Sequence, residues 1–409
     1  MKILQINAVY GHGSTGIIVR DLEQICEDRG IECYVASQDK NVCKSKRGYH
    51  IGNIIDYKLH ALLCRIAGKQ AYFSKRSTRK LLEYIDKVSP DIVHMHIIHN
   101  NYIHLNLLLE YLAENKIKTV VTLHDCWFFT GGCFHYTNVG CDKWKTKCEK
   151  CVKRWKDTPA YLYDASNEIL KDRIKYFSAI QDITFVGCSK WIASEIAQSK
   201  LKNCGEITYI HNGFDLQTFS PRLSKLKEKL GLEGKFVVLG PASKWLQSIN
   251  KNELDYFTRN LPQNGVLLLF GTKNIEVKMP HNVMLYGYTR NRIELAELYS
   301  MADVMVNCSR EDTLSSINLE CQACGTPVIT YDATGSKETV DEKSGFAVST
   351  GDVELLFSQM MLVHTNGKKY YSDNCRRFIE NNFEKKNNYL KYINLYQSLT
   401  SKNNRTFNI

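Results

Sequence analysis

Short apolar runs rich in β-branched residues alternate with longer amphipathic stretches along nearly the whole chain. Alternation of this kind is typical of βα units, in which helices cover a parallel sheet. The chain has 409 residues, more than one ordinary hydrophobic core organises. We therefore expect an α/β protein with two doubly wound domains.

A cluster of turn residues near the middle of the chain predicts the domain boundary. Asn212-Gly213-Phe214-Asp215 is followed by Pro221 and by the charged segment 222–229, a composition that favours a hinge. Helical spacing of aromatic residues near the C-terminus predicts a helix that packs back on the first domain. The expected parts are a first domain at 1–213 with a Cys-rich loop at 126–155, a second domain at 214–375, and a C-terminal helix and tail at 376–409.

The bulk composition limits the functional classes. A net charge of +11 favours anionic partners, but the positive charge is dispersed and no nucleic-acid-binding pattern occurs, so nucleic acid is not an expected partner. The sequence lacks an apolar run of about 18 residues. Met1–Ile6 has the pattern of a first strand rather than of an export signal. We expect a cytoplasmic protein whose fifteen cysteines are reduced.

The segment 308–340 carries the strongest functional signal. An expected strand ends near Asn307, a loop of small polar residues follows, and a helix then carries Glu320. Loops at the carboxyl ends of parallel strands, and the amides of helix N-termini, bind anions in α/β proteins. Glu320 could accept hydrogen bonds from a ribose diol, and Asp312 could accept them from sugar hydroxyls. An ordinary βα turn with a capping serine is the alternative. The candidate binding residues of the loop are Thr313, Leu314, Ser315 and Ser316.

This segment resembles the carboxylate-x7-Glu motif of glycosyltransferase family 4. Ala323–Ile329 (Ala-Cys-Gly-Thr-Pro-Val-Ile) is similar to the signature that follows the motif, and Asp332–Glu338 resembles its Gly-Gly-x-x-Glu turn. The resemblance covers nearly the whole chain and is strongest to a bacterial capsule or exopolysaccharide subgroup. It implies the GT-B fold, with two facing Rossmann-like domains and an interdomain cleft, and a retaining glycosyltransferase. Asp312, with Glu311 as a competitor, would take the place of the first carboxylate, and Glu320 that of the second.

A glycine-rich loop follows the first expected strand. Its sequence, Gly11-His12-Gly13-Ser14-Thr15-Gly16, lacks the spacing of the dinucleotide-binding Gly-x-Gly-x-x-Gly, which argues against a dehydrogenase. The loop resembles the Gly-Ser-Thr-Gly loop of the same subgroup, which borders the interdomain cleft. We assign Gly13 and Ser14 to donor binding. The acceptor-side candidates are Gly11, His12, Thr15 and Gly16.

His124 lies at the end of an expected strand, where an imidazole could bind a hydroxyl of the donor sugar. A core histidine is the alternative, and the resemblance places the family's cleft histidine here. Of His94, His96 and His99, one could reach the cleft, but structural roles are favoured.

The expected phosphate clamp departs from the family pattern. Gly240–Trp245 resembles the subgroup's Gly-x-Ala-Ser-x-Trp, which normally continues to a basic pair and a glycine, whereas Leu246–Asp255 lacks Arg-Lys-Gly. Because a cationic clamp stabilises a diphosphate leaving group, the departure implies a relocated lysine, weak activity or a changed donor. The candidates are Lys251, then Lys244, with Ser243 beside it. Tyr286 and Gly287 belong to a segment that borders the nucleotide base in the family, with a buried tyrosine as the alternative.

Four cysteines lie within nineteen residues of a polar, basic loop, with the spacing C-x7-C-x6-C-x2-C. Four thiolates at such separations can close a tetrahedral zinc site. Only the last pair forms a standard half-site, so free thiols are the alternative. The candidate ligands of a structural zinc are Cys133, Cys141, Cys148 and Cys151.

Residues 54–67 carry apolar side chains at helical spacing and are followed by basic residues. A helix buried in the first domain is the favoured interpretation. An amphipathic helix on a membrane surface, suited to a lipid-linked acceptor, is the alternative.

Taken with the resemblance, these features predict a glycosyltransferase that moves a sugar from a nucleotide diphosphate donor to a glycan or polyprenyl-linked acceptor. No cofactor is expected for catalysis, because no Asp-x-Asp metal motif occurs. The protein would be cytoplasmic, with peripheral contact at the inner face of the membrane as an option. A sugar-nucleotide epimerase on the same fold and a non-catalytic nucleotide-sugar-binding protein are the alternatives.

Overall fold

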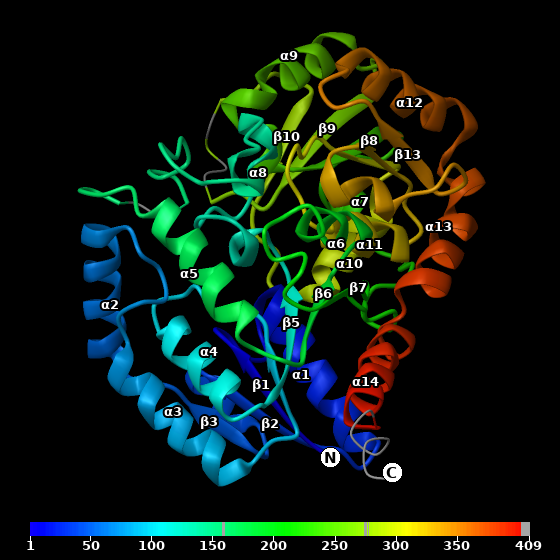
Figure 1. The fold of residues 1–409 in the computed structure, drawn as a ribbon. Helices are drawn as coiled ribbons and strands as arrows, with labels where there is room; N and C mark the ends of the chain where they lie inside the picture. Colours follow the sequence, from blue (N-terminus) through cyan, green and yellow to red (C-terminus); the bar gives the residue numbers. More distant parts are fainter. Residues whose placement is uncertain (158–159, 274–275, 277, 402–409) are drawn as a thin grey trace. The chain divides into compact units, whose positions relative to one another are not determined.

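The structure, a computed structural model, describes residues 1–157, 160–273, 276 and 278–401. It divides into two compact units. Unit 1 comprises Met1–Asn212 and the segment from Asn388 to the C-terminus, and unit 2 comprises Gly213–Asn387. Each unit is built on one parallel sheet covered by helices (Figure 1). The expected α/β class is therefore confirmed.

Unit 1 contains a seven-stranded sheet in the order β3-β2-β1-β4-β5-β6-β7, in which every strand pair is parallel. Strands such as β5, Lys-Thr-Val-Val-Thr-Leu, are buried along their whole length, as expected for a sheet covered on both faces. The strands are β1 (Lys2–Asn7), β2 (Glu32–Ser37), β3 (Gly48–His50), β4 (Ile92–Met95), β5 (Lys118–Leu123), β6 (Ile183–Gly187) and β7 (Glu206–Tyr209). The main helices are α1 (Gly13–Asp28), α2 (Ile54–Ala67), α3 (Lys75–Val88), α4 (Leu105–Glu114), α5 (Ser166–Ser178), α6 (Lys190–Ile196) and α14 (Lys385–Ser401).

Unit 2 contains a six-stranded parallel sheet in the order β10-β9-β8-β11-β12-β13. The strands are β8 (Phe236–Pro241), β9 (Gly265–Phe270), β10 (Val283–Tyr286), β11 (Val304–Asn307), β12 (Val328–Tyr331) and β13 (Gly345–Val348). The helices are α7 (Leu226–Lys229), α8 (Ala242–Trp245), α9 (Lys251–Asn260), α10 (Arg292–Met301), α11 (Ser316–Ala323), α12 (Val353–Asn366) and α13 (Lys368–Phe383).

The C-terminal helix α14 belongs to the core of unit 1. Tyr389, Tyr392 and Tyr396 are buried in the same cluster as side chains of β1, β4, β5 and β6. The hydroxyls of Tyr392 and Tyr396 also form hydrogen bonds inside this core, with Thr122 at 2.9 Å and with His94 at 2.6 Å. A C-terminal helix that packs on the first unit, as predicted, is therefore confirmed.

The segment expected as one C-terminal part, 376–409, is divided between the two units. Helix α13 ends at Phe383 in unit 2, and the extended backbone of Glu384 separates it from α14. The amide of Phe214 donates to the Phe383 carbonyl at 2.8 Å, so both chain crossings between the units lie close together. Residues 402–409, expected to be frayed, lie outside the described residues. Within the described part of the chain, no helix is both long and apolar enough to cross a bilayer.

Candidate active site

In unit 2 the strand order reverses between β8 and β11, which are neighbours in the sheet. In open α/β sheets, ligands bind outside the carboxyl ends of the strands at such a switch point. Two segments leave the sheet there: β8 continues into α8, and β11 continues into the loop before α11. The sequence motifs single out both of these segments.

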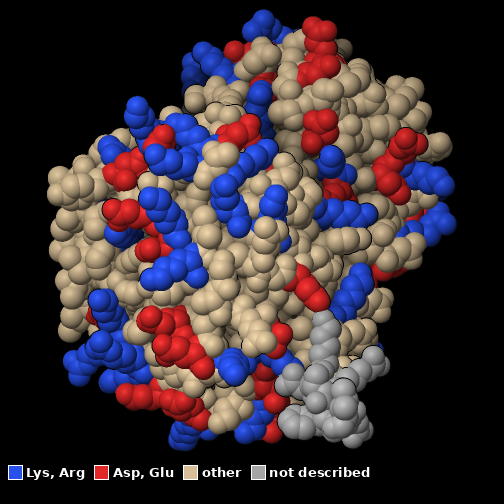
Figure 2. Space-filling model, in the orientation of Figure 1, with Lys and Arg blue, Asp and Glu red and all other residues tan. Residues whose placement is uncertain are grey.

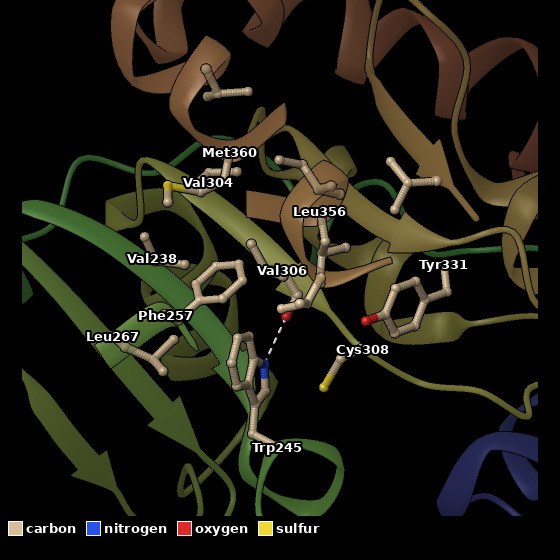
Figure 3. Close-up of a cluster of buried hydrophobic side chains, with 14 of the residues drawn as sticks. Val238, Trp245, Phe257, Leu267, Val304, Val306, Cys308, Tyr331, Leu356 and Met360 are labelled. Carbon is tan, nitrogen blue, oxygen red and sulfur yellow. Dashed lines mark hydrogen bonds between the residues drawn. The ribbon is translucent and has the colours of Figure 1, made fainter. Parts of the chain in front are cut away.

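Trp245 fixes the position of α8 against β11 (Figure 3). Its buried indole Nε1 donates to the Val306 carbonyl at 2.9 Å, and its ring packs edge-on against Phe257. A side chain at Gly240 would place its Cβ 2.2 Å from the indole nitrogen, so glycine is required at this position. The Gly-x-Ala-Ser-x-Trp pattern is therefore explained by packing at the switch point.

The loop between β11 and α11 is held by buried amide side chains. Asn307 Nδ2 donates to Ser315 Oγ at 3.1 Å and to Asn318 Oδ1 at 2.8 Å. Thr313, Leu314 and Ser315 are buried by this arrangement. Ser315 is the N-cap of α11 but makes no side-chain capping bond, so the first-turn amides of α11 have no partner within the helix. These amides can bind an anion at the end of the sheet.

Glu320 lies on α11 and is set into an apolar environment. The Tyr299 hydroxyl donates to Glu320 Oε2 at 3.2 Å. Burial raises the pKa of Glu320 to about 7, although the positive charge of Arg292 and the Tyr299 hydrogen bond oppose the shift. A carboxyl group poised in this way can accept hydrogen bonds from a diol once it is ionised.

Asp312 is half-buried in the same loop. Its amide donates to Thr334 Oγ1 at 3.0 Å, and its carbonyl accepts a bond of 3.0 Å from the amide of Gly335. The Asp312 backbone is thus tied to the turn that follows β12, the segment expected to match the Gly-Gly-x-x-Glu turn. Thr334 adopts a left-handed backbone with φ of 55°, a conformation that costs free energy for a β-branched residue.

The two candidate clamp lysines differ in their surroundings. Lys251 is the exposed first residue of α9, whereas Lys244 is half-buried on α8. Cys308 directly follows β11, and burial raises the pKa of its thiol. The positive charges of Arg310 and Lys244 oppose this rise, so both cations lie near the carboxyl end of β11. Ser243, beside Lys244, is exposed. Lys244 is thus the lysine that the structure brings to the switch point.

Arg310 is a cation at this edge that the sequence motifs did not single out. Its Nε donates to Asn250 Oδ1 at 2.9 Å, and its Nη2 donates to Glu253 Oε1 at 2.6 Å. Asn250 in turn donates to the carbonyls of Lys244 and Cys308, at 3.1 and 3.0 Å. Asn250 therefore links α8 to the end of β11 in the stretch where the family pattern predicts a basic pair. The only sequence signal for Arg310 is that a charged residue lies three positions after the end of β11.

Tyr286 and Gly287 lie where β10 ends. The Tyr286 hydroxyl donates to Glu294 Oε1 at 2.7 Å. Burial is the main reason that the pKa of Tyr286 is raised to about 12, and this hydrogen bond is the second. The Gly287 carbonyl accepts a bond of 3.3 Å from the amide of Gly271. The Tyr286 side chain is half-buried, so contact with a nucleotide base at this place stays a prediction.

In unit 1, the glycine-rich loop follows β1 and forms the first turn of α1, which begins at Gly13. Gly11 and Gly13 have φ of 74° and 62°, the left-handed region that favours glycine. His12 is the N-cap, and its Nε2 lies 2.6 Å from Asp39 Oδ2. Ser14, Thr15 and Gly16 complete the helical turn. The sheet order also reverses between β1 and β4, so this loop occupies the switch point of unit 1.

His124 follows β5 and is stacked on a second histidine. Its Nε2 lies 3.1 Å from His96 Nδ1, and His96 Nε2 lies 3.2 Å from Gln5 Oε1. Burial lowers the pKa of His124 to about 4. The charge of Asp125 opposes this shift, and the neighbouring His99 adds to it. His124 is therefore neutral near pH 7 and can donate or accept a hydrogen bond. His94 and His96 are fully buried in the sheet.

Unit 1 also contains a cavity at the carboxyl ends of β2 and β3. Its polar lining includes Lys40, His50, Tyr57 and Asn101. Lys40 follows Asp39, the carboxylate bound to His12, so the cavity adjoins the glycine-rich loop. No short sequence pattern predicts this cavity, because its lining comes from three separate segments.

The four clustered cysteines do not form a ready ligand set. Among the residues that the structure describes, no group of three or more His, Cys, Asp or Glu side chains is arranged to hold a metal ion. Burial raises the pKa of Cys133 to about 12 and that of Cys148 to about 11, which favours thiols over thiolates. Cys133 and Cys151 line one small cavity. A structural zinc stays a prediction.

Two protein-family profiles match the sequence. The profile described as Glycosyltransferase Family 4 matches residues 16–218, and the profile described as Glycosyl transferases group 1 matches residues 272–385. WcaC of Escherichia coli, whose name is putative colanic acid biosynthesis glycosyl transferase, is 24% identical over 370 residues, which is 86% of this chain and 88% of WcaC. The UDP-Gal:alpha-D-GlcNAc-diphosphoundecaprenol alpha-1,3-galactosyltransferase of Escherichia coli is 29% identical over 203 residues, which is 44% of this chain and 50% of that enzyme.

Solved structures share the fold over nearly the full length. HepE from Anabaena in complex with UDP has a TM-score of 0.68 at 15% identity, covering 97% of this chain and 100% of HepE. HepE has also been solved in complex with UDP-glucose. Sucrose-phosphate synthase from Thermosynechococcus elongatus has a TM-score of 0.65 at 17% identity, covering 98% and 99% of the two chains. At these identities the comparison establishes the fold alone.

Proposed function

The chain belongs to glycosyltransferase family 4, and we propose that it transfers a hexose from a UDP-sugar to a lipid-linked glycan with retention of the anomeric configuration. It is a glycosyltransferase of polysaccharide biosynthesis with the GT-B fold. The observation that carries the donor assignment is the position of Glu320, on the helix that follows the anion-binding loop at the switch point of unit 2. The UDP complexes of HepE and the name of the E. coli galactosyltransferase support the choice of UDP.

Each donor-side group has a separate task in this proposal. Glu320 accepts hydrogen bonds from the ribose diol, and the first-turn amides of α11 bind the diphosphate. Lys244 lies close enough to the end of β11 to offset the charge of the leaving group. Asp312 accepts hydrogen bonds from hydroxyls of the donor sugar, and Tyr286 and Gly287 border the base.

Retention follows from attack on the face that the leaving group departs from. The bond between the acceptor oxygen and the anomeric carbon forms as the bond from that carbon to the diphosphate oxygen breaks, and the acceptor proton passes to the departing diphosphate. No protein group has to act as the base. This agrees with His124, whose low pKa makes it a neutral hydrogen-bonding group for a sugar hydroxyl.

Unit 1 supplies the acceptor side. The glycine-rich loop and the adjoining cavity offer Lys40, His50 and Tyr57 to a polar ligand. A polyprenyl diphosphate sugar is a polar ligand of this kind, and the galactosyltransferase relative is named for such an acceptor.

The test combines binding with product analysis. We expect a UDP-hexose to raise the melting temperature of the wild type, and we expect labelled hexose to appear in a lipid fraction only when a polyprenyl diphosphate sugar is added. NMR of the product should show the anomeric configuration of the donor. The Glu320→Ala variant should lose donor binding by about tenfold or more. If it kept both binding and turnover, or if the label left as an isomerised nucleotide sugar without acceptor, the proposal would be wrong.

A further inference from the structure

Helix α2 exposes a continuous apolar face, contrary to the favoured sequence interpretation of a buried helix. Only His60 and Cys64 are buried along its length, and His60 Nδ1 lies 2.7 Å from Ser74 Oγ beneath it. The helix is thus fixed to unit 1 by one narrow stripe. Its exposed apolar side chains are Ile54 at 64%, Ile55 at 75%, Leu59 at 53%, Leu62 at 54% and Ile66 at 40%. Residues 55, 59, 62 and 66 share one side of the helix.

A second apolar group lies next to the end of α2. The amide of Tyr161 donates to the Arg65 carbonyl at 2.8 Å. A Cβ on Gly68 would lie 2.8 Å from the Tyr163 carbonyl, so the loop packs directly on the helix terminus. The exposed side chains of this group are Val152 at 69%, Trp155 at 54%, Tyr161 at 60%, Leu162 at 64% and Tyr163 at 64%. We call the two groups together the α2 face.

Positive charge surrounds the α2 face. The segments 54–69 and 152–157, which carry most of the face, contain six Lys or Arg residues and two Asp or Glu residues, whereas the whole chain has 54 and 43. Lys58 and Arg65 are exposed on α2 itself, and the Arg154 guanidinium lies 4.5 Å from the ring centre of Trp155. In Figure 2 the edge of the molecule where α2 lies is mostly tan, with Lys and Arg atoms and some Asp and Glu atoms beside it.

We propose that the α2 face is the surface by which the protein docks on a lipid bilayer that carries anionic headgroups. Soluble proteins rarely expose so many contiguous large apolar side chains. An apolar helical face flanked by Lys and Arg inserts into the boundary between headgroups and acyl chains, and tyrosine and tryptophan favour that same depth. Basic side chains at the rim add attraction to anionic headgroups, and a bilayer meets both requirements at once.

The α2 face lies next to the cavity at the ends of β2 and β3. Ile54 belongs to the face and also lines the cavity at the ends of β2 and β3. A docked bilayer would therefore present headgroups beside the cavity in which we place the acceptor. The docking proposal itself rests on exposure and charge and not on the proposed reaction, so the two can fail separately.

The experiment measures co-sedimentation of the full chain with vesicles, without donor or acceptor. We expect binding to vesicles of phosphatidylcholine mixed with phosphatidylglycerol, weaker binding to phosphatidylcholine alone, and a marked loss at high salt. The double variant Leu59→Gln/Leu62→Gln should bind at least about tenfold more weakly, because two inserting side chains are lost. Lys58→Gln/Arg65→Gln should weaken binding only to the anionic vesicles.

Matched controls separate docking from misfolding and from catalysis. Leu223→Gln/Tyr370→Gln removes two exposed apolar side chains from unit 2 and should leave vesicle binding unchanged. Glu320→Ala should lose donor binding and keep vesicle binding. The proposal is overturned if the wild type does not sediment with anionic vesicles. It is also overturned if Leu59→Gln/Leu62→Gln, shown by circular dichroism to be folded, binds these vesicles as strongly as the wild type. It is also overturned if that variant instead dissociates a dimer in analytical ultracentrifugation, since the face would then join two copies of the chain.

Discussion

The pKa of Glu320 predicts a pH dependence of donor binding. Burial raises this pKa to about 7, so the side chain is largely protonated below that pH and ionised above it. Only the ionised form can accept hydrogen bonds from both ribose hydroxyls. We therefore expect the affinity for UDP-glucose, whose diphosphate does not titrate in this range, to rise as the pH increases through 7, by up to the factor lost in Glu320→Ala, and to level off at higher pH.

Calorimetric titrations of UDP-glucose at several pH values between about 6 and 8 check this prediction. The Glu320→Gln variant is the control, because its amide keeps the shape and does not titrate. It should bind more weakly at high pH and show a flat profile. A profile that survived in Glu320→Gln would assign the titration to another group.

Single residues show what the sequence could and could not predict. The motif positions of Asp312 and Glu320 follow from a strand, a loop and a helix that are adjacent in sequence, so their placement at the end of β11 could be expected. The partners that set the chemistry of Glu320 could not. Tyr299 and Arg292 come from α10 and approach only because α10 and α11 pack together. The same holds for His96, which follows β4 and reaches His124 at the end of the neighbouring strand β5.

At the scale of elements, the environment of α8 and α9 separates the two candidate clamp lysines. Lys244 is half-buried on a helix that Trp245 and Asn250 fix to the end of β11, whereas Lys251 is exposed. A fixed cation near a leaving group lowers the barrier more than a mobile, hydrated one. We expect Lys244→Met to lower kcat about a hundredfold, whereas Lys251→Met should lower it less than about threefold.

Steady-state kinetics with a UDP-hexose compare the two lysine variants, and melting temperatures show whether each is folded. Both side chains have part of their surface in solvent, so neither change should lower the melting temperature appreciably. An equal loss of kcat in the two variants, or a larger one in Lys251→Met, would contradict the assignment.

Helix α2 illustrates a limit of pattern analysis at the same scale. Apolar spacing predicts the helix and its sides, and the structure confirms the helix with the expected bounds. The same spacing fits a helix buried under a neighbour and a helix facing a bilayer, because both need one apolar side. The choice depends on the narrow buried stripe at His60 and Cys64, which is a tertiary contact that no local period encodes.

For the whole molecule, buried titratable groups predict that acid acts oppositely on the two units. Unit 1 contains histidines whose pKa burial lowers from 6.5, to about 3 for His94 and about 4 for His60 and His124. Between pH 6.5 and these values the unfolded chain binds more protons than the folded one, so stability is lost as the pH falls. By about pH 4.5 the loss is on the order of 2 kcal/mol for each such histidine.

Unit 2 should respond in the other direction over the same range. The raised pKa of Glu320, about 7 against an ordinary 4.5, means that the folded state binds the extra proton, so stability is gained as the pH falls from 7 to 4.5. Urea titrations at several pH values, read by a brief deuterium pulse at one fixed pH and assigned by peptide mass, give a midpoint for each unit. We expect the midpoint of β4 peptides to fall and that of β11 peptides to rise. In Glu320→Gln the rise of the β11 midpoint should vanish while the fall of the β4 midpoint remains. Midpoints that moved together would show that the two units do not unfold independently or that the titrating groups lie elsewhere.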